Sequence, residues 1–473
     1  MSIDVCYVFS NGFGTRMILQ SGVVPHLRSL GISIAVVSPN AEEPSLQELA
    51  RRQGILLEPV PKIGGRRMTR YHRMRRYMFE DIRQNPSIWA RHMQARANPP
   101  KHPLKRLRQA LYYPMNRASV RFPWFRQFLK RMEARALQST EMSEMLNRLR
   151  PRVAVATYPI DALDSCFLHE ARQLGIHTVG HLMSWDNVTT KGRFPIVTDS
   201  YISWGPIMTD ELRQYYDIPA ERIHECGVAH FDLHVQAPAR DRFVHTMAGL
   251  GLDPDKPYLF FGMTTPNFSA REIEIVEWLA GRVRSGAFGA DMQLVVRQHP
   301  QNAHPNADPN PRLRRLQGNR VGVHFPGLEE SRLRWNLLEA DLQQLASLIA
   351  GCTVSFNSGS TLTIDAIVHD KPVVVTAFDV GEQPPWWASA GRVLGELHFK
   401  KLTALGGVRV AHSLEELEAT TRAYLADPAL DARGRAATRQ AECGACDGQA
   451  SERIANALAE ICRMTSAGAG VQA

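Results

Sequence analysis

The chain has 473 residues, of which 44% are hydrophobic and 22% charged, and its formal net charge is +9. This length favours two or three globular domains, and the ordinary composition excludes intrinsically disordered, collagen-like and coiled-coil proteins. Seven irregularly spaced cysteines are too few for a disulfide scaffold, and we expect neither a signal peptide nor a membrane span, which favours a cytoplasmic protein with reduced thiols.

The N-terminal half alternates patterns typical of strands and helices. Residues 3–9 form an apolar run that predicts a buried strand, and a glycine-bearing turn at 11–14 and a helical pattern over 16–30 follow it. This order predicts the start of a doubly wound parallel sheet. The turn lacks the full GxGxxG spacing and therefore does not indicate NAD binding. Further strands are predicted at 32–37, 153–156, 177–182 and 200–203, and helices at 163–174 and 208–216.

A strongly basic segment, residues 62–135, interrupts this alternation. It contains 20 Lys and Arg residues against 3 Asp and Glu residues, a local net charge of +17, so the rest of the chain sums to −8 (9 − 17). Aromatic residues are interleaved with these charges. We interpret the segment as a helical insertion suited to an anionic membrane surface or a lipid-linked phosphate. The alternative is a set of solvated helical faces. Nucleic acid is the least favoured interpretation, because no nucleic-acid motif accompanies the charge.

A second alternating set begins near residue 257. Its predicted strands are 258–262, 293–297, 352–356 and 373–376, and its predicted helices are 270–283, 342–349 and 362–368. We therefore predict an α/β protein with two Rossmann-like domains facing a cleft, the first over residues 1–235 and the second over 236–446. In open parallel sheets ligands bind beyond the carboxyl ends of the strands, and candidate site residues are sought there.

One candidate site is the segment SGSTLTID at 358–365, which follows a predicted strand and opens a predicted helix. Backbone N–H groups at a helix start, together with Ser358, Gly359 and Ser360, would bind a phosphate or diphosphate. Asp365 would then accept a hydrogen bond from a ribose hydroxyl. The alternative is an ordinary N-cap, with Asp365 as a surface charge.

Two further motifs end strands of the second predicted domain. In RQHP, Arg297 offers a forked donor for phosphate and His299 a donor to a phosphoryl oxygen. In GMTTP, Thr264 and Thr265 would lie beside the same diphosphate. The alternatives are a structural histidine and an ordinary turn between strand and helix.

Candidate acceptor-activating carboxylates lie in the first predicted domain. In SWDNVTTKG at 184–192, Trp185 could stack on a sugar or base and Asp186 could accept a proton from a hydroxyl. The alternative is a capping turn in which Trp185 packs into the core. Asp161 and Asp164, which follow an earlier strand, are rival carboxylates, and the sequence does not choose among the three.

Neither a metal nor a redox centre is expected. The single CxxC at 443–446 lacks further ligands, and a DxD-type cluster is absent from the strand ends, so a divalent metal on the diphosphate is not indicated. The segment GVAHFD at 227–232 could line the cleft or simply seat the linker between domains.

Several segments together resemble the GT-B glycosyltransferase superfamily, in particular bacterial surface-polysaccharide transferases and the CDP-glycerol glycerophosphotransferases. The resemblance spans roughly residues 150–460, and the basic segment matches nothing in it. It is carried by RQHP (297–300), NSGSTLTIDAIVHDKPVVV (357–375), DGQASERIANAL (447–458), SWDNVTTKG (184–192), YISWGP (201–206) and CGVAHFD (226–232).

The resemblance implies a nucleotide-activated donor held mainly by the C-terminal domain and an acceptor held mainly by the N-terminal one. By matched position it places segment 358–360 and Asp365 on the diphosphate and ribose, and Arg297 and His299 near the donor phosphates. It also implies that a helix and tail over 447–473 cross back to the N-terminal domain. Asp365 stands where many of these enzymes have glutamate, and the EX7E pattern of many retaining members is absent.

The leading hypothesis is a metal-independent glycosyltransferase, without a cofactor, that moves a sugar from a nucleotide sugar to a hydroxyl of a cell-surface glycan or lipid-linked acceptor. Asp186 or Asp161 would deprotonate that hydroxyl. We expect it in the cytoplasm, at the inner face of the membrane. Two alternatives stay open. One is glycerophosphate or polyol-phosphate transfer from a CDP-linked donor, and the other is a non-enzymatic membrane-binding or nucleic-acid-binding protein acting through residues 62–135.

Overall fold

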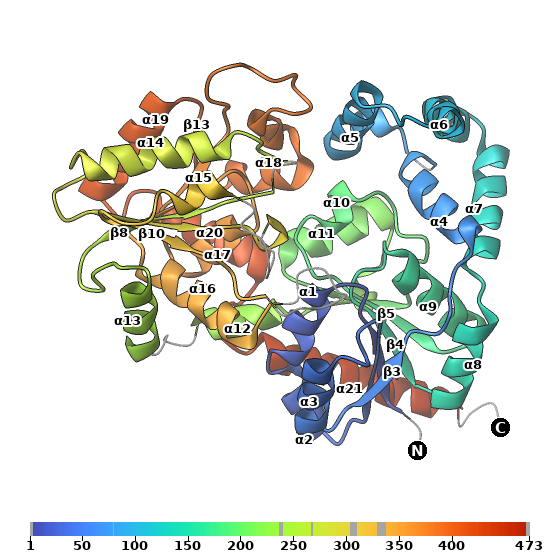
Figure 1. The fold of residues 1–473 in the computed structure, drawn as a ribbon. Helices are drawn as coiled ribbons and strands as arrows, with labels where there is room; N and C mark the ends of the chain where they lie inside the picture. Colours follow the sequence, from blue (N-terminus) through green and yellow to red (C-terminus); the bar gives the residue numbers. More distant parts are fainter. Residues whose placement is uncertain are drawn as a thin grey trace. The chain divides into compact units, whose positions relative to one another are not determined.

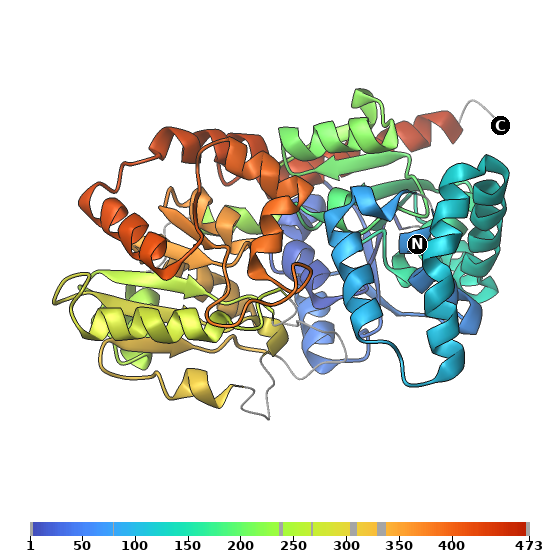
Figure 2. The same ribbon diagram turned by 90° about the horizontal axis from the view of Figure 1, so that it is seen from above.

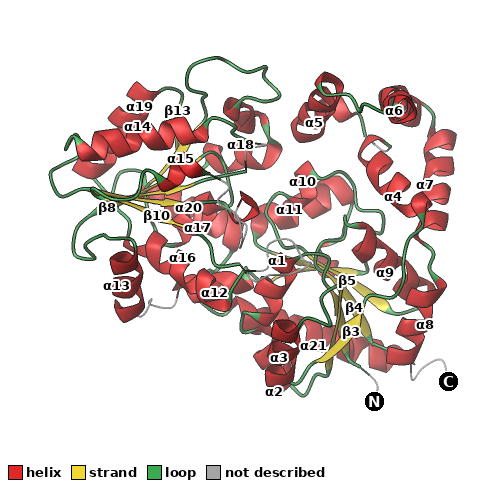
Figure 3. Ribbon diagram, viewed as in Figure 1, coloured by secondary structure: helices red, strands yellow, loops and turns green. Residues whose placement is uncertain are grey.

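The computed structural model describes residues 3–78, 80–235, 240–265, 268–302, 310–328 and 337–469. The chain divides into two compact units (Figures 1 and 3). Unit 1 contains the residues up to Ala229 and those from Gln449 onwards, and unit 2 runs from His230 to Gly448. Sequence patterning put the boundary after residue 235. Residue 236, Pro266 of the GMTTP motif and residues 470–473 of the tail lie outside the described residues.

Unit 1 is built on a parallel sheet of seven strands in the order β3-β2-β1-β4-β5-β6-β7. β1 lies at its centre, with Val5 opposite both Ile34 and Val153. The central strands β1, β2 and β4 are buried along their whole length, because parallel strands of this kind are covered on both faces, which explains their apolar runs. The strands are β1 (Val5–Val8), β2 (Ile34–Ser38), β3 (Leu56–Pro59), β4 (Val153–Ala156), β5 (His177–His181), β6 (Ser200–Ser203) and β7 (Ile223–Glu225).

Helices of unit 1 connect these strands and cover the sheet (Figure 3). They are α1 (Gly12–Gly14), the π-helical η1 (Thr15–Leu19), α2 (Val23–Ser29), α3 (Pro44–Gln53), α8 (Thr140–Leu149), α9 (Ala162–Gln173), α10 (Asn187–Thr190), α11 (Pro206–Tyr216), η4 (Ala220–Arg222) and α21 (Ala450–Ala469). A short η5 (Ala229–Phe231) spans the division between the units.

The C-terminal helix α21 belongs to unit 1, although the whole of unit 2 precedes it in the sequence. It packs against α2. The Nε of Arg453 donates to the backbone oxygen of Cys226 over 2.9 Å. A Cβ at Gly22 would lie 3.1 Å from the Cβ of Ser451, so the absence of a side chain there permits this close helix packing. Burial of Ile454, Leu458 and similar side chains holds the helix in place.

The basic segment folds as a group of helices inserted between β3 and β4 (Figure 2). α7 packs against α4, α6 and α9, so the group rests on the body of unit 1. A buried ion pair holds this group of helices in place, because the Nε of Arg75 lies 3.2 Å from the Oε1 of Glu133. The elements are α4 (Arg66–Met74), η2 (Arg75–Tyr77), η3 (Ile82–Gln84), α5 (Pro86–Ala97), α6 (Pro103–Arg121) and α7 (Pro123–Leu137).

Unit 2 is built on a second parallel sheet, of six strands in the order β10-β9-β8-β11-β12-β13. β8 lies between β9 and β11, with Phe261 opposite both Val296 and Phe356. The strands are β8 (Tyr258–Gly262), β9 (Gln293–Arg297), β10 (Val321–His324), β11 (Val354–Asn357), β12 (Val373–Thr376) and β13 (Arg409–Ala411).

The helices of unit 2 alternate with these strands along the chain. The predicted α/β class, with two Rossmann-like parallel sheets, is therefore confirmed. In the described part of the chain, no helix is both long and apolar enough to cross a bilayer. The helices are α12 (Asp232–Val235), α13 (Arg240–Gly249), α14 (Glu272–Arg284), η6 (Pro300–Asn302), α15 (Pro311–Arg314), α16 (Glu339–Gly351), α17 (Leu362–Val368), η7 (Ala390–Gly395), α18 (Leu397–Ala404), α19 (Leu414–Ala426) and α20 (Ala432–Cys443).

Candidate functional site

The predicted donor residues of unit 2 follow strands that end at one edge of its sheet. Gly262, the last residue of β8, pairs with Arg297, the last residue of β9. Asn357 ends β11 next to β12. A Cβ at Gly262 would lie 2.1 Å from the Cδ1 of Leu362, so glycine is required there for α17 to approach β8. The segments after β8, β9 and β11 therefore meet at the edge where ligands of such sheets bind.

A buried carboxylate that sequence reasoning missed joins two of these segments. Glu272 is the first residue of α14 and is 2% exposed. Its Oε1 accepts a hydrogen bond from the hydroxyl of Ser358 over 2.7 Å, and its Oε2 accepts one from the backbone N–H of Thr264 over 2.8 Å. The hydroxyls of Ser358 and Thr376 lie 2.9 Å apart. Burial raises the pKa of Glu272 to about 7, against these hydrogen bonds.

The backbone amides expected to bind phosphate are already engaged. The side-chain oxygen of Asn357 accepts hydrogen bonds from the N–H groups of Gly359 (2.8 Å) and Ser360 (2.9 Å) and from the hydroxyl of Thr363. α17 has only seven residues and begins at Leu362, which limits its dipole. A phosphate would have to displace the Asn357 carboxamide to reach these two amides. The expectation of open amides at this helix start is corrected accordingly.

Gly359 has a conformational role of its own. Its φ of +81° lies in the left-handed region, and a Cβ there would approach Val393 to 2.5 Å. Ser360 differs from its neighbours, because its Oγ is shielded from solvent and has no hydrogen-bond partner among the described residues. A buried hydroxyl without a partner is costly, so this oxygen is the polar atom of the segment best suited to a ligand.

Arg297 lies in the interior of unit 2 rather than being open to a ligand. It is 3% exposed, and its guanidinium donates to Asp341 over 2.6 Å and to the Nδ1 of His324 over 2.7 Å. Asp341 in turn accepts the N–H of Gly327 over 3.0 Å. A buried guanidinium needs such a carboxylate, because an unpaired buried charge is strongly unfavourable. The two guanidinium nitrogens that were predicted to bind phosphate are therefore engaged by His324 and Asp341 in the interior of unit 2.

His299, two residues further on, is half-buried and uncharged. Its Nδ1 accepts the backbone N–H of Gln301 over 3.0 Å. Burial, with a smaller effect of the Arg297 charge, lowers its pKa to about 4. Because Nδ1 is an acceptor, the ring proton sits on Nε2, which is thus a neutral donor. Thr264 and Thr265, both buried, lie on the neighbouring segment after β8.

Asp365 points to another part of unit 2. Its Oδ1 lies 3.5 Å from the Nε2 of His234 on α12, and its side chain is 6% exposed. The Nδ1 of His234 lies 3.1 Å from the Nε2 of His369. Burial lowers the pKa of His369 to about 4, so this second imidazole is neutral. The carboxylate predicted to bind ribose is thus part of a polar chain through two histidines.

Asp186, in unit 1, is heavily hydrogen-bonded. Its carboxylate accepts from the hydroxyls of Ser184 (2.7 Å) and Thr190 (2.9 Å) and lies 2.6 Å from the Nζ of Lys191. Both oxygens of this carboxylate are therefore engaged within unit 1. Trp185 is 4% exposed, which favours the packing interpretation over stacking on a sugar.

Asp161 and Asp164 differ sharply in their surroundings. Asp164 is fully buried, accepts the N–H of Tyr158 over 2.8 Å, and has a pKa raised well above its ordinary range by burial. Asp161 is half-buried and caps α9, with one oxygen accepting the N–H of Leu163 over 2.9 Å. Its charge opposes the effect of burial on the pKa of His72 in α4.

The basic insertion contributes cations to this edge of unit 1. Burial raises the pKa of Tyr158 to about 12, and the charges of Asp186 and Asp161 add to that effect. Arg76 and Arg91, from the insertion, oppose it. Tyr158 and Asp161 follow β4 and Asp186 follows β5, so these groups lie beyond the carboxyl ends of the two strands. The insertion reaches the same region, because the side-chain N–H of Asn85 donates to the backbone oxygen of Thr189 over 2.7 Å.

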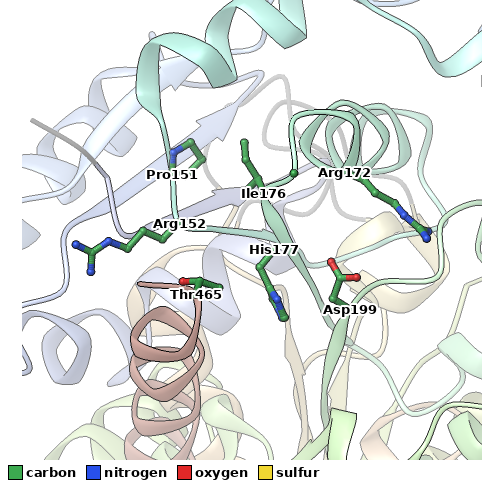
Figure 4. Close-up of a pocket in the computed structure, with 8 residues that line it drawn as sticks. Pro151, Arg152, Arg172, Ile176, His177, Asp199 and Thr465 are labelled. Carbon is green, nitrogen blue, oxygen red and sulfur yellow. The ribbon is translucent and has the colours of Figure 1, made fainter. Parts of the chain in front are cut away.

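A separate cavity of about 800 Å³ lies at the opposite edge of the same sheet (Figure 4). Its lining residues lie at the starts of β4, β5 and β6 and on α9 and α21, and none of them is a predicted site residue: Pro151, Arg152, Arg172, Gly175, Ile176, His177, Asp199 and Thr465. Its charged side chains have partners: Arg152 lies 3.2 Å from Asp4, and Asp199 accepts hydrogen bonds from the N–H and the hydroxyl of Thr178. In the residues with defined positions, no three His, Cys, Asp or Glu side chains are grouped to hold a metal, and Cys443 and Cys446 are free thiols.

The sequence matches no known protein-family model and no curated protein. Solved structures do match along nearly the whole chain. The S. aureus MnaA protein, solved with UDP, has a TM-score of 0.56 at 11% identity over 96% of this chain and 95% of that chain. UDP-GlcNAc 2-epimerase from Neisseria meningitidis, bound to UDP-GlcNAc, has a TM-score of 0.54 at 11% identity over 97% and 100%. The glycotransferase of kitacinnamycin has a TM-score of 0.51 at 14% identity over 97% and 99%.

At this level of identity the likeness defines the fold, and the fold is GT-B-like. The GT-B resemblance inferred from the motifs is therefore confirmed for the fold. The narrower likeness to surface-polysaccharide transferases and glycerophosphotransferases stays a prediction.

Proposed function

We propose that the protein is a metal-independent glycosyltransferase that takes a sugar from a nucleotide-sugar donor and transfers it to a hydroxyl of a cell-surface glycan or lipid-linked acceptor. The observation that carries the proposal is the joining of the segments after β8 and β11 by Glu272, with His299 from β9 beside them. This edge of unit 2 presents hydroxyls and a neutral imidazole, which are suitable donors to a diphosphate.

On the donor side, three groups would contact the nucleotide. The Oγ of Ser360 would donate to a phosphate oxygen, since it lacks a partner in the described chain. The Nε2–H of His299 would donate to the departing diphosphate. Thr265 would lie beside the same diphosphate. Asp365 would accept a ribose hydroxyl while His234 orients its carboxylate. Arg297 would act from behind, by holding the ends of β9 and β10 in position.

On the acceptor side, Asp161 is the better base of the two candidates. Asp186 is neutralised by Lys191, whereas one oxygen of Asp161 accepts only a backbone N–H in a helix cap. Asp161 would take the proton of the acceptor hydroxyl while the acceptor oxygen forms a bond to the anomeric carbon of the donor sugar. The bond from that carbon to the phosphate oxygen breaks, and the nucleoside diphosphate leaves with the electron pair. A lipid-linked acceptor would place the chain in the cytoplasm at the inner face of the membrane.

A panel of UDP-, GDP-, CDP-, CMP- and dTDP-linked donors tests the donor assignment by thermal shift, because a ligand bound only by the folded chain raises its unfolding temperature. We expect one nucleotide class to stabilise the chain and Asp365→Ala to abolish that shift. If no donor shifts the midpoint, the proposal fails.

Product analysis with the stabilising donor separates the reactions. Release of nucleoside diphosphate, or of CMP from a CMP-linked donor, indicates sugar transfer. Release of CMP from a CDP-linked donor indicates polyol-phosphate transfer instead. Conversion of the donor sugar without nucleotide release would indicate an epimerase, the activity named for the Neisseria structure. Either of the last two outcomes would replace the proposed reaction while retaining the donor site.

A further inference from the structure

The basic insertion exposes an unusual amount of apolar surface. Among the described residues, 14 large hydrophobic side chains are exposed, and 7 of them fall between residues 104 and 128. Three are Leu104, Leu107 and Leu111 on α6, at 70%, 60% and 56% exposure. Their spacing places them on one side of the helix, away from the buried Asn116. We call these leucines, together with Phe122, Trp124 and Phe128 of the α6–α7 junction and α7, the α6–α7 face.

Aromatic side chains continue this surface where α6 passes into α7. Phe122, Trp124 and Phe128 are 46%, 69% and 51% exposed. Trp124 and Phe128 are four residues apart and therefore share one side of α7. On that helix the opposite side, with Leu129 and Glu133, is buried. Large rings are thus held outward by a helix whose other side is anchored.

The charge around this face is almost entirely positive. From residue 101 to residue 135 there are ten Lys and Arg residues and one acidic residue, Glu133. Glu133 is buried against Arg75 and gives no negative charge to the surface. Lys105 and Arg106 lie between the exposed leucines, and Lys130 and Arg131 follow Phe128. All four of these basic residues are exposed.

The face is held rigidly by the body of unit 1. The side chain of Asn116 on α6 accepts the N–H of Ile82 over 3.4 Å and donates to the backbone oxygen of Glu80. α7 packs against both α4 and α9. Helices anchored in this way keep their outer side chains exposed, instead of folding them inward.

This combination fits a lipid surface better than the other possible occupants. The core of a protein interface is depleted of charged residues, whereas here lysine and arginine alternate with the apolar residues. Exposed leucines add nothing to binding of a nucleic-acid backbone. An interfacial helix, in contrast, buries leucine and aromatic side chains at the level of the headgroups while basic residues contact anionic phosphates.

We propose that the α6–α7 face binds the surface of an anionic phospholipid bilayer, with Leu104, Leu107, Leu111 and the aromatic side chains at the headgroup level. This inference deepens the proposed function, since it names the surface that would bring the chain to a lipid-linked acceptor. Lipid binding and sugar transfer are measured separately, so either can fail without the other.

The test is co-sedimentation of the full chain with vesicles of phosphatidylcholine containing about 30% phosphatidylglycerol, compared with pure phosphatidylcholine. We expect binding to the anionic vesicles that weakens with salt. Combined Leu104→Ser, Leu107→Ser and Leu111→Ser substitutions should weaken it at least about tenfold. Lys105→Glu with Arg106→Glu should remove the preference for anionic lipid. Leu30→Ser with Met464→Ser, which removes exposed apolar side chains elsewhere, is the matched control and should bind as the wild type.

Quenching by brominated lipid shows which side chain enters the interface. The wild-type tryptophan fluorescence should be quenched by brominated anionic vesicles. Trp124→Phe should keep the binding and lose most of the quenching, whereas Trp386→Phe, exposed on unit 2, should lose none. These substitutions are conservative, and circular dichroism checks that each variant is folded.

Three results would overturn the proposal. The first is no binding of the wild-type chain to anionic vesicles at low salt. The second is equal binding by the triple-serine variant. The third is a concentration-dependent dimer, or a complex with single-stranded RNA, that the triple-serine variant loses while vesicle binding is absent.

Discussion

The hydroxyl of Ser358 donates to the carboxylate of Glu272 over 2.7 Å, although 86 residues separate the two in the chain. The other oxygen of that carboxylate accepts the N–H of Thr264. One buried acidic side chain thus holds the segments after β8 and β11 in a fixed relationship.

Glu272 should make the stability of unit 2 depend on pH. Its pKa rises from an ordinary value of 4.5 to about 7 on folding, so folding favours the protonated form. This contribution is fully present below pH 4.5 and is lost as the pH rises through about 7. Its size is about 3 kcal/mol, at 1.36 kcal/mol per pKa unit.

Urea unfolding of the wild type and of Glu272→Gln at pH 5 and pH 8 measures that contribution. We expect the wild type to lose stability relative to the variant between these values, because glutamine does not titrate. Glu274→Gln, on the same helix and paired with Arg271 at the surface, should follow the wild type. An identical pH dependence of wild type and Glu272→Gln would contradict the prediction.

Arg297 should matter for stability more than for direct contact with a ligand. Arg297→Ala leaves the carboxylate of Asp341 buried without its partner and should cost about 3–5 kcal/mol. Arg297→Met with Asp341→Leu removes both charges and should cost less than the single substitution. Arg312→Ala, which breaks an exposed ion pair with Glu277, is the control and should cost under about 1 kcal/mol. Chemical denaturation measures the unfolding free energy of each variant. If Arg297→Ala keeps its stability but loses donor binding, Arg297 binds the donor phosphate directly.

The two serines of the 358–360 segment should respond in opposite ways. Ser360→Ala removes a hydroxyl without a partner in the described chain, so donor affinity should fall with little change in stability. Ser358→Ala removes a hydrogen bond to a buried carboxylate and should cost about 1–3 kcal/mol of unfolding free energy. Calorimetry with the stabilising nucleotide and denaturation of each variant measure these effects. The reverse pattern would show that Ser358 is the ligand group.

Asp161 should carry the proton transfer if the proposed reaction is right. Asp161→Asn should lower kcat about 10²–10⁴-fold with an unchanged KM for the donor. Asp186→Asn should act on the ion pair with Lys191 and reduce stability instead. Steady-state kinetics on both variants, with the donor found by thermal shift, distinguishes the roles. A larger loss of kcat in Asp186→Asn would exchange the two assignments.

The interior strands of both sheets were predictable from the sequence, and the edge strands were not. The four unpredicted strands are β3, β7, β10 and β13, which are the outermost strands of the two sheets. An interior parallel strand is covered on both faces and forms an unbroken apolar run. β3 (LLEP) and β7 (IHE) are partly exposed and mix polar with apolar residues, so no such run marks them.

The first predicted helix shows a second limit of sequence patterning. A single helix was expected over residues 16–30, but the chain forms the π-helical η1 and then α2. The hydroxyl of Ser21 donates to the backbone oxygen of Met17 over 2.6 Å, and Pro25 has no N–H to continue the helix. The neighbouring Gly22 lies against Ser451 of the last helix, a contact that no local pattern reveals.

The amino-acid sequence by itself determined the α/β class, the interior strands and the sheet edges beyond which the polar motifs lie, because apolar periodicity and strand ends are local properties. The tertiary structure alone decided the state of each polar group. Arg297 donates to Asp341, the backbone amides of Gly359 and Ser360 donate to the side chain of Asn357, and the hydroxyl of Ser358 donates to Glu272. The partners of Arg297 and Ser358 are distant in the chain, and burial makes every such group take whichever partner the fold brings near.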